Sequence, residues 1–131
     1  MSPVVHRMPM PVRWRDMDAF GHVNNAAYLG YVEEARVCWF RELTEDWATA
    51  ASAPILAAVA MNYRKPITWP EDVVVELLAD RVGTKSVTIG HRIVSASDAE
   101  VVYADGHAVL VWVDRNGATI PLPQTIRTAC S

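Results

Sequence analysis

Residues 16–36 read DMDAFGHVNNAAYLGYVEEAR, a polar loop that passes directly into a predicted helix. The apolar residues of that helix recur three or four positions apart, which places them on one face: Tyr28, Val32, Ala35, Trp39 and Leu43. Asn24 or Asn25 is a suitable N-cap, because an asparagine side chain accepts a backbone N–H of the first helical turn. We predict one long helix that begins there and ends between Thr44 and Trp47.

The rest of the chain has patterns typical of β-strands. Four segments of strand length follow the helix: Leu56–Tyr63, Val73–Ala79, Val87–Ile93 and Val101–Val113. A short β-like stretch, Val12–Arg15, precedes the polar loop. The connections between the later segments are short and contain turn residues such as Asn116 and Gly117, which favours antiparallel pairing.

One apolar-faced helix and one sheet can bury their apolar faces only against each other. The sequence therefore predicts an α+β fold, in which an antiparallel sheet of about five strands wraps around the long helix as a single domain over residues 1–131. A sheet of this kind has exposed edges, so pairing with a second copy of the chain through an edge strand is expected.

The composition is that of an ordinary globular protein. Apolar residues make up 51% and charged residues 21% of the 131 residues, and the net charge is −3. An acidic balance argues against nucleic acid as a partner, because binding to phosphates needs a surplus of Lys and Arg. The two cysteines, Cys38 and Cys130, have neither metal-ligand nor disulfide spacing, so we predict no metal site.

No targeting or membrane segment is expected. No apolar run approaches the roughly 18 residues that a membrane-spanning helix needs. The residues after His6 and Arg7 do not form the apolar core of a signal peptide. We therefore expect a soluble, cytoplasmic protein that does not insert into a membrane.

The loop before the helix contains groups suited to acyl transfer. Two acids, a glycine, a histidine and two asparagines lie within the ten residues 16–25. Unpaired N–H groups and the helix dipole at the helix start can polarise a carbonyl group. A nearby carboxylate can attack that carbonyl or activate water against it. These residue types are also the usual ones in loops and caps, so composition alone does not establish a catalytic site.

The order of these residues resembles the 4-hydroxybenzoyl-CoA thioesterase family, in its branch with D-x-D-x-x-G-H-V-N-N-x-x-Y followed by E-E-A-R. Residues 16–36 match that pattern in register, and two later segments are also similar: NYRKPI at 62–67 to the family's Y-R-x-P-I strand end, and VGTKS at 82–86 to its V-G-x-x-S turn. The resemblance covers about Val12 to Val113. It implies the hot-dog fold, and dimers or dimers of dimers with active sites at the subunit interface.

The resemblance also implies roles for individual residues. Asp18 stands at the position of the catalytic carboxylate, either as a nucleophile that forms an anhydride or as a general base on water. The backbone N–H near Asn25 stands where the family polarises the thioester carbonyl. His22 and Asn24 are further site candidates that position the loop, orient Asp18 or contact the substrate. Asp16 is expected to shape the loop or to pair with Arg13 or Arg15.

Residues near strand ends are expected to bind the substrate. Arg64, Lys65, Lys85 and Ser86 are candidates for contacts with CoA, whose phosphates suit basic side chains. Trp39, Phe40, Trp47 and residues 48–53 are candidate walls of an acyl pocket. His91 falls on the apolar phase of its strand, which indicates a hydrogen-bonded core histidine. No cofactor is expected, because the CoA moiety is part of the substrate.

These features predict an acyl-CoA thioesterase, a hydrolase, with three alternatives. A hot-dog hydratase would share the fold, but hydratases of this fold resemble each other in an Asp and a His five positions apart, whereas Asp18 and His22 are four apart. A thioesterase for acyl-carrier proteins would need a basic surface at the pocket mouth, because the carriers are acidic. A non-catalytic acyl-thioester binding protein would not need a carboxylate beside the thioester.

Overall fold

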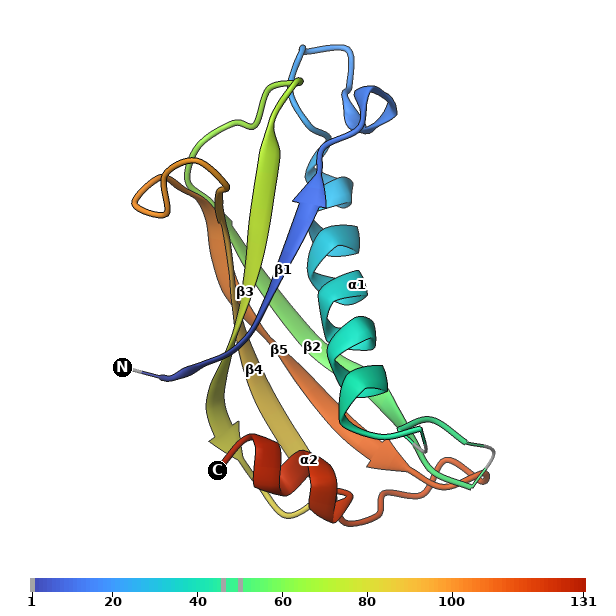
Figure 1. Ribbon diagram of the computed structural model, residues 1–131. Helices are drawn as coiled ribbons and strands as arrows, with labels where there is room; N and C mark the ends of the chain where they lie inside the picture. The colour runs from blue at the N-terminus through green and yellow to red at the C-terminus, as the bar shows by residue number, and fades with distance from the viewer. Residues whose placement is uncertain (1, 46, 50) are drawn as a thin grey trace.

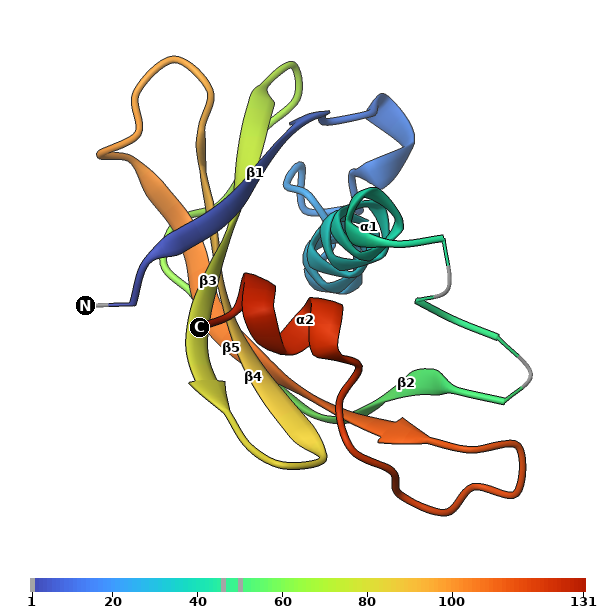
Figure 2. The same cartoon turned by 60° about the horizontal axis from the view of Figure 1, so that its bottom comes forward.

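The computed structural model describes residues 2–45, 47–49 and 51–131. Its elements, in chain order, are β1 (Val4–Pro11), the 3-10 turn η1 (Trp14–Asp16), α1 (Asn25–Leu43), β2 (Ala53–Tyr63), β3 (Asp72–Val82), β4 (Ser86–Ser95), β5 (Val102–Val113) and α2 (Gln124–Ala129). The strands form one antiparallel sheet in the order β1-β3-β4-β5-β2. The sheet curves around α1, as Figures 1 and 2 show. The predicted α+β architecture is confirmed.

Helix α1 forms where the periodic apolar residues predict it. Its buried side chains include four of the five predicted ones, and they pack into the core beside Val75, Leu77 and Ile89 of the sheet. A larger apolar side chain among them, such as that of Val32, contributes roughly 1.5–3 kcal/mol when it is fully buried. Asn24 is the N-cap, since its Oδ1 accepts the N–H of Ala26 at 2.8 Å. The helix ends at Leu43, within one residue of the predicted limit.

The first strand lies earlier than predicted. Residues 12–15 were expected to be β-like, but the strand is Val4–Pro11, and η1 begins at Trp14. The strand contains Pro9 and Pro11. In the described part of the chain, β1 lies at an edge of the sheet and pairs only with β3. One side of its backbone therefore makes no ladder hydrogen bonds there, so prolines are tolerated.

The short helix α2 was not predicted, and it closes the end of the sheet that lies far from the polar loop (Figure 1). Its Ile126 is fully buried and Cys130, which follows it, is 8% exposed. The Nη2 of Arg127 donates to the carbonyls of Gly83 and Thr84 in the β3–β4 turn, at 3.0 Å each. Six residues are too few to show a helical period, so the sequence pattern gave no signal for α2.

His91 is a core residue, as predicted. It is 1% exposed, and its Nε2 lies 3.0 Å from the carbonyl oxygen of Ala60. Burial lowers the pKa of His91 to about 4, so the ring is neutral at physiological pH. Its role is to fill the space between the sheet and α1 and to hold β2 in place.

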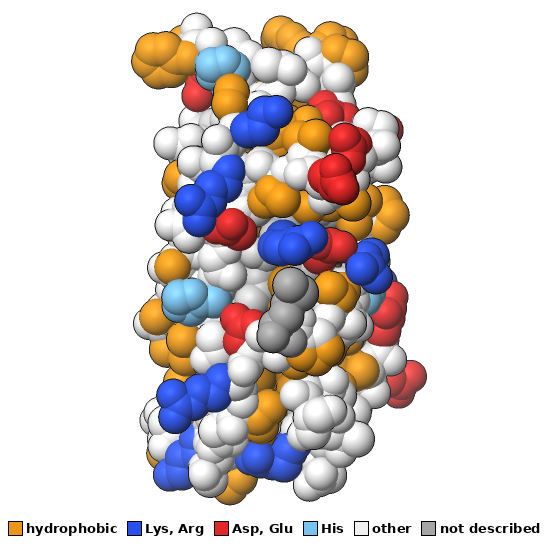
Figure 3. Space-filling view, turned by 90° about the vertical axis from the view of Figure 1, so that its left-hand side faces the viewer, with side chains coloured by type: hydrophobic (Ala, Val, Ile, Leu, Met, Phe, Trp, Pro, Cys, Tyr) orange, Lys and Arg blue, Asp and Glu red, His pale blue; other side chains and the backbone are white. Residues whose placement is uncertain are grey.

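The face of the sheet opposite α1 carries charges of both signs. Arg7, Glu76, Arg92 and Asp105 are successive register partners on β1, β3, β4 and β5. Glu76 pairs with Arg7 at 2.9 Å and with Arg92 at 2.7 Å. Blue and red side chains are correspondingly interspersed in Figure 3, without a large patch of one sign. None of the helices in the described part of the chain is long and apolar enough to cross a membrane.

Candidate active site

The loop before α1 is folded by its own backbone hydrogen bonds. The N–H of Asp18 donates to the carbonyl of His22 at 2.9 Å, and the N–H of Gly21 donates to the carbonyl of Asp18 at 3.2 Å. Gly21 has a φ of 80°, a left-handed conformation that glycine adopts without strain. The side-chain Oδ1 of Asp18 accepts the N–H of Phe20 at 2.9 Å. Its Oδ2 makes none of the hydrogen bonds found among the described residues, so one carboxylate oxygen is held and the other is available.

Asp16 anchors this loop to α1. Its Oδ2 accepts the hydroxyl of Tyr31 at 2.6 Å and the backbone N–H of Arg13 at 3.0 Å. Its carbonyl accepts the N–H of Asn24 at 2.9 Å. Burial and the adjacent Asp16 carboxylate raise the pKa of Tyr31, which therefore stays a hydrogen-bond donor. Asp16 thus shapes the loop, as predicted, through Tyr31 and backbone groups and not through an arginine side chain.

The start of α1 leaves one backbone donor available. Asn24 uses its Oδ1 for the N–H of Ala26 and its carbonyl for the N–H of Ala27, at 2.8 and 2.9 Å. None of the hydrogen bonds in the described residues uses the N–H of Asn25. An unpaired N–H at the positive end of a helix dipole is a ready donor to a carbonyl or an oxyanion.

Asp18 and Asn25 line the same cavity, which has a volume of about 370 Å³. We call it the helix-start pocket. It contains five of the predicted site residues: Asp18, His22, Asn25, Arg64 and Lys65. Asn24 is not among its lining residues and serves as the helix cap. The side chain of His22 makes no hydrogen bond or ion pair among the described residues. The pocket therefore combines a carboxylate, an available N–H and cations from the end of β2.

Two tyrosines form a wall that the sequence analysis did not assign to the site. The hydroxyl of Tyr63 donates to the carbonyl of Asn25 at 3.2 Å, and that of Tyr28 donates to the carbonyl of Lys65 at 3.4 Å. Their rings meet edge to face at 5.0 Å. Burial raises the pKa of Tyr28, and the neighbouring Tyr63 and Asp18 add to the shift. These contacts tie the helix start to the end of β2, and Tyr63 was visible beforehand as part of the NYRKPI segment.

The two cations of the pocket differ in their surroundings. Arg64 pairs with Asp105, with an Nη2–Oδ1 distance of 3.1 Å. Burial alone would raise the pKa of Asp105, but hydrogen bonds from Arg64 and Asn62 outweigh it and lower that pKa. Lys65 has no ion pair among the described residues. Lys65 is therefore the less compensated positive charge at this site.

Lys85 and Ser86 lie at the other end of the sheet. The Nζ of Lys85 donates to the hydroxyl of Thr119 at 3.3 Å, and the carbonyl of Ser86 accepts the N–H of Gly83 at 2.8 Å. Figure 1 shows this β3–β4 turn next to α2 and far from the loop that precedes α1. Within one chain, the structure does not bring these two residues to the helix-start pocket.

The aromatic residues proposed as acyl-pocket walls occupy the core. Trp39 and Phe40 are 4% and 2% exposed, and Trp47 packs against Phe40 with ring centroids 6.0 Å apart. Trp39 and Phe40 thus pack inside the core of this chain, and their role as walls of the acyl pocket stays a prediction. Ala50, within the proposed segment 48–53, lies outside the described residues.

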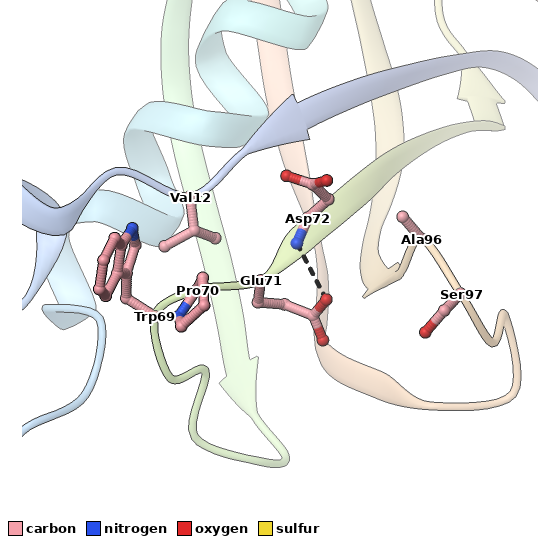
Figure 4. Close-up of a pocket in the computed structure, with 7 residues that line it drawn as sticks. All are labelled: Val12, Trp69, Pro70, Glu71, Asp72, Ala96 and Ser97. Carbon is pink, nitrogen blue, oxygen red and sulfur yellow. Dashed lines mark hydrogen bonds between the residues drawn. The ribbon is translucent and has the colours of Figure 1, made fainter.

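A larger cavity, of about 580 Å³, lies at the start of β3 (Figure 4). Two carboxylates line it, those of Glu71 and Asp72. Glu71 accepts hydrogen bonds from the hydroxyls of Tyr103 and Ser95 and from the N–H of Asp72. Burial and the hydrogen bond to Glu71 raise the pKa of Tyr103 to about 12. The Asp72 carboxylate makes none of the hydrogen bonds found among the described residues. None of the lining residues belongs to a helix start, however, so this cavity lacks the combination of carboxylate and helix-start N–H that Asp18 and Asn25 provide.

Comparison with known proteins matches most of the chain to one family. The profile described as the thioesterase-like superfamily matches residues 12–130. A solved structure from Pseudomonas aeruginosa, assigned provisionally as a thioesterase, is 43% identical with a TM-score of 0.93, over 98% of this chain and 100% of that one. Another from Xanthomonas campestris, assigned provisionally as an acyl-CoA thioesterase, is 48% identical with a TM-score of 0.84, over 92% and 100% of the two chains.

Two curated relatives extend the comparison. The long-chain acyl-CoA thioesterase FadM of Escherichia coli is 31% identical over 107 residues, which are 79% of each chain. A chloroplastic acyl-acyl carrier protein thioesterase of Arabidopsis thaliana is 22% identical over 126 residues, which are 94% of this chain but 66% of that protein. The predicted hot-dog arrangement of sheet and helix is thereby confirmed.

Proposed function

The chain belongs to the thioesterase-like superfamily, and we propose that it hydrolyses acyl-CoA thioesters to a free acid and CoA. One observation carries this proposal: the available Oδ2 of Asp18 and the available N–H of Asn25 belong to residues that line one pocket. Relatives named as acyl-CoA thioesterases support CoA as the carrier. Membership in the 4-hydroxybenzoyl-CoA branch stays a prediction.

In the proposed mechanism, the thioester carbonyl oxygen accepts the N–H of Asn25. The donor stabilises negative charge on that oxygen as the carbonyl carbon becomes tetrahedral. Asp18 then attacks the carbon, expels the CoA thiolate and leaves a mixed anhydride for water to hydrolyse. In the other route, Asp18 removes a proton from a water molecule that attacks directly. Both routes use only water and groups of this chain, the Asp18 carboxylate and the Asn25 N–H, so the proposed mechanism contains neither a cofactor nor a metal.

We propose that Lys65 and Arg64 bind the phosphates of CoA at the rim of the same pocket. His22, also in the pocket, would contact the substrate without acting on the carbonyl. Lys85 and Ser86 stay candidates for CoA contacts. Their position at the far end of the sheet means that they would have to come from a second copy of the chain.

We also propose that two copies pair along β2. Among the described residues, this strand is bonded only to β5, so its other edge is open to a second copy. Apolar side chains on β2 and on the adjacent face of α1 are exposed: Ile55, Leu56, Val59, Leu29 and Val37. Arg36 lies beside this apolar surface and is 5% exposed, yet its Nη1 has no hydrogen-bond partner among the described residues. We propose that a second copy supplies an acceptor for it. Light scattering should therefore report a dimer or a larger even-numbered assembly, and Val59→Glu should shift it towards monomer.

The decisive experiment follows thiol release from a panel of acyl-CoAs with wild type and Asp18→Asn. Release by wild type and its loss in the variant would support the proposal, whereas a rate retained by Asp18→Asn would refute the role of Asp18. Acyl-carrier-protein thioesters belong in the same assay, because the plant relative is named for that carrier. Hydration of an enoyl-CoA, followed separately, tests the hydratase alternative. Incorporation of ¹⁸O from water into Asp18 would identify the anhydride route.

A further inference from the structure

Asp18 also lines a second cavity, which the proposed mechanism does not use. This tryptophan pocket has a volume of about 480 Å³ and is formed by Trp14, Arg15, Met17, Asp18, Gly21 and Trp69. Asp18 is the one residue that it shares with the helix-start pocket. We propose that the tryptophan pocket binds the acyl group of the thioester, and that Trp14 and Trp69 set a preference for large apolar acyl groups over acetyl. This inference rests on the proposed thioesterase function.

The two tryptophans are placed as a binding surface and not as core residues. Trp14 is 72% exposed and Trp69 is 47% exposed, although indole rings are normally well buried. Trp14 belongs to η1, and Trp69 to the loop between β2 and β3, so the two come from distant parts of the chain. In Figure 4 the indole of Trp69 lies beyond Pro70 from Glu71, directed away from that carboxylate. Exposed aromatic rings gathered beside an available carboxylate indicate a ligand contact.

The position of Asp18 in both pockets fits the shape of a thioester. The carbonyl carbon carries two large substituents, the acyl group and the sulfur of CoA, and these leave it in different directions. If that carbon lies at Asp18, each substituent has one cavity to enter. The phosphates of CoA match Lys65 and Arg64, so CoA takes the helix-start pocket and the tryptophan pocket remains for the acyl group.

The chemistry of the tryptophan pocket agrees with this assignment. Two indoles and the thioether of Met17 offer large, polarizable apolar surfaces, which suit an aliphatic chain or an aryl ring. Arg15 is its single cation, whereas the helix-start pocket has Arg64 and Lys65. Acetyl offers these surfaces only one methyl group to bury, so selectivity for larger apolar groups follows.

The test compares kcat/KM for acetyl-, hexanoyl-, decanoyl- and phenylacetyl-CoA in wild type, Trp14→Ala and Trp69→Ala. We expect each variant to lose about tenfold with decanoyl- and phenylacetyl-CoA, and less than about twofold with acetyl-CoA. Phe20→Ala is the matched control, since Phe20 is an aromatic residue that is 85% exposed but lines only the helix-start pocket. It should change all four rates by a similar factor and leave their ratios intact.

Binding provides a readout that does not depend on turnover. Calorimetry on Asp18→Asn should show tighter binding of decanoyl-CoA than of CoA, and this difference should disappear when Trp14→Ala and Trp69→Ala are added. If wild type hydrolyses acyl-CoAs but the tryptophan variants keep its chain-length preference, the inference is wrong and the proposed function stands. If wild type hydrolyses none of them, the proposed function fails, and calorimetry alone decides the acyl site. Loss of a larger assembly in the tryptophan variants, with the acyl preference unchanged, would instead assign these rings to a contact between copies.

Discussion

The two ends of the sheet use their polar groups differently. At the α2 end, the β3–β4 turn is closed by neighbouring groups: Arg127 donates to the carbonyls of Gly83 and Thr84, and Lys85 bonds Thr119. At the loop end, which comprises residues 12–25 and the start of α1, groups of the same kinds are left available. The N–H of Asn25 and the Oδ2 of Asp18 make no hydrogen bonds among the described residues.

This difference distinguishes groups that stabilise the fold from groups that are available to a substrate. Folded chains pair most of their polar groups and bury most of their large apolar side chains, because unpaired polar groups and exposed apolar surface cost free energy. The loop end keeps a carboxylate oxygen and a helix-start N–H unpaired and the Trp14 indole exposed, and the contacts of Asp16 with Tyr31 and Arg13 hold it in place. Such a segment is where a substrate completes the missing interactions.

The largest effect expected from this comparison concerns Asp18. Asp18→Asn should lower kcat by roughly 10³-fold, because it removes the proposed nucleophile or base. The same change should leave the melting temperature nearly unaltered, because the amide oxygen still accepts the N–H of Phe20. Thiol-release kinetics and differential scanning calorimetry measure the two quantities. A strongly destabilised variant would mean that Asp18 stabilises the fold. The loop end would then not differ from the α2 end in this respect.

The opposite pattern is expected at the α2 end. Ile126 is fully buried, so Ile126→Ala should lower the free energy of unfolding by roughly 2–5 kcal/mol. Its kcat, measured at a temperature where the variant remains folded, should match wild type. Urea titration and thiol release provide the measurements, with the exposed Thr125→Ala as the control for effects on helix α2 itself. A selective loss of kcat in folded Ile126→Ala would show that the two ends are coupled.

The same contrast explains what sequence could and could not predict. Helix α1 was predictable because 19 residues display its period, and its start was predictable from Asn24 as a cap. The grouping of Asp18 with Asn25 followed from a motif in one continuous loop. β1 was misplaced because prolines that an edge strand tolerates look like strand breakers.

Residues from separate elements were harder to assign to the site. The four predicted CoA-binding residues all lie near strand ends: Arg64, Lys65, Lys85 and Ser86. Consecutive antiparallel strands finish at opposite ends of the sheet, so a position near a strand end does not tell at which end of the sheet the residue lies. Only the pair that follows β2 lines the helix-start pocket. The tryptophan pocket could not be predicted at all, because Trp14 and Trp69 meet only through the fold.

His91 provides a further comparison with Asp18, because it is a titratable group that is buried in the core and lies outside the helix-start pocket. Its pKa of about 4 in the folded state lies below the ordinary value of 6.5. The unfolded chain therefore binds more protons between these pH values, and stability falls as pH decreases through this window. At pH 5 the loss from this group is roughly 2 kcal/mol relative to neutral pH.

Replacing the imidazole of His91 should remove its contribution to the pH dependence of the free energy of unfolding. In His91→Gln, the free energy of unfolding should depend less on pH between 6.5 and 4 than in wild type, whatever its value at pH 7. The pH profile of kcat should not move, because His91 lies outside the helix-start pocket. Urea titrations at a series of pH values give the first quantity and thiol release the second. A shifted kcat profile would assign His91 to the chemistry and contradict its structural role.

The smallest effects are expected for the cations of the helix-start pocket. Lys65→Ala should raise KM for acyl-CoAs several-fold with kcat nearly constant, a loss of about 1 kcal/mol that grows at low salt. Arg64→Ala should raise KM less, because Asp105 already compensates its charge. Asp105→Asn should release Arg64 and lower KM slightly, and this gain should vanish in the double variant with Arg64→Ala. Equal effects of Lys65→Ala and Arg64→Ala, or a KM unaffected by Asp105→Asn, would show that the Asp105 ion pair does not restrain Arg64 at the loop end.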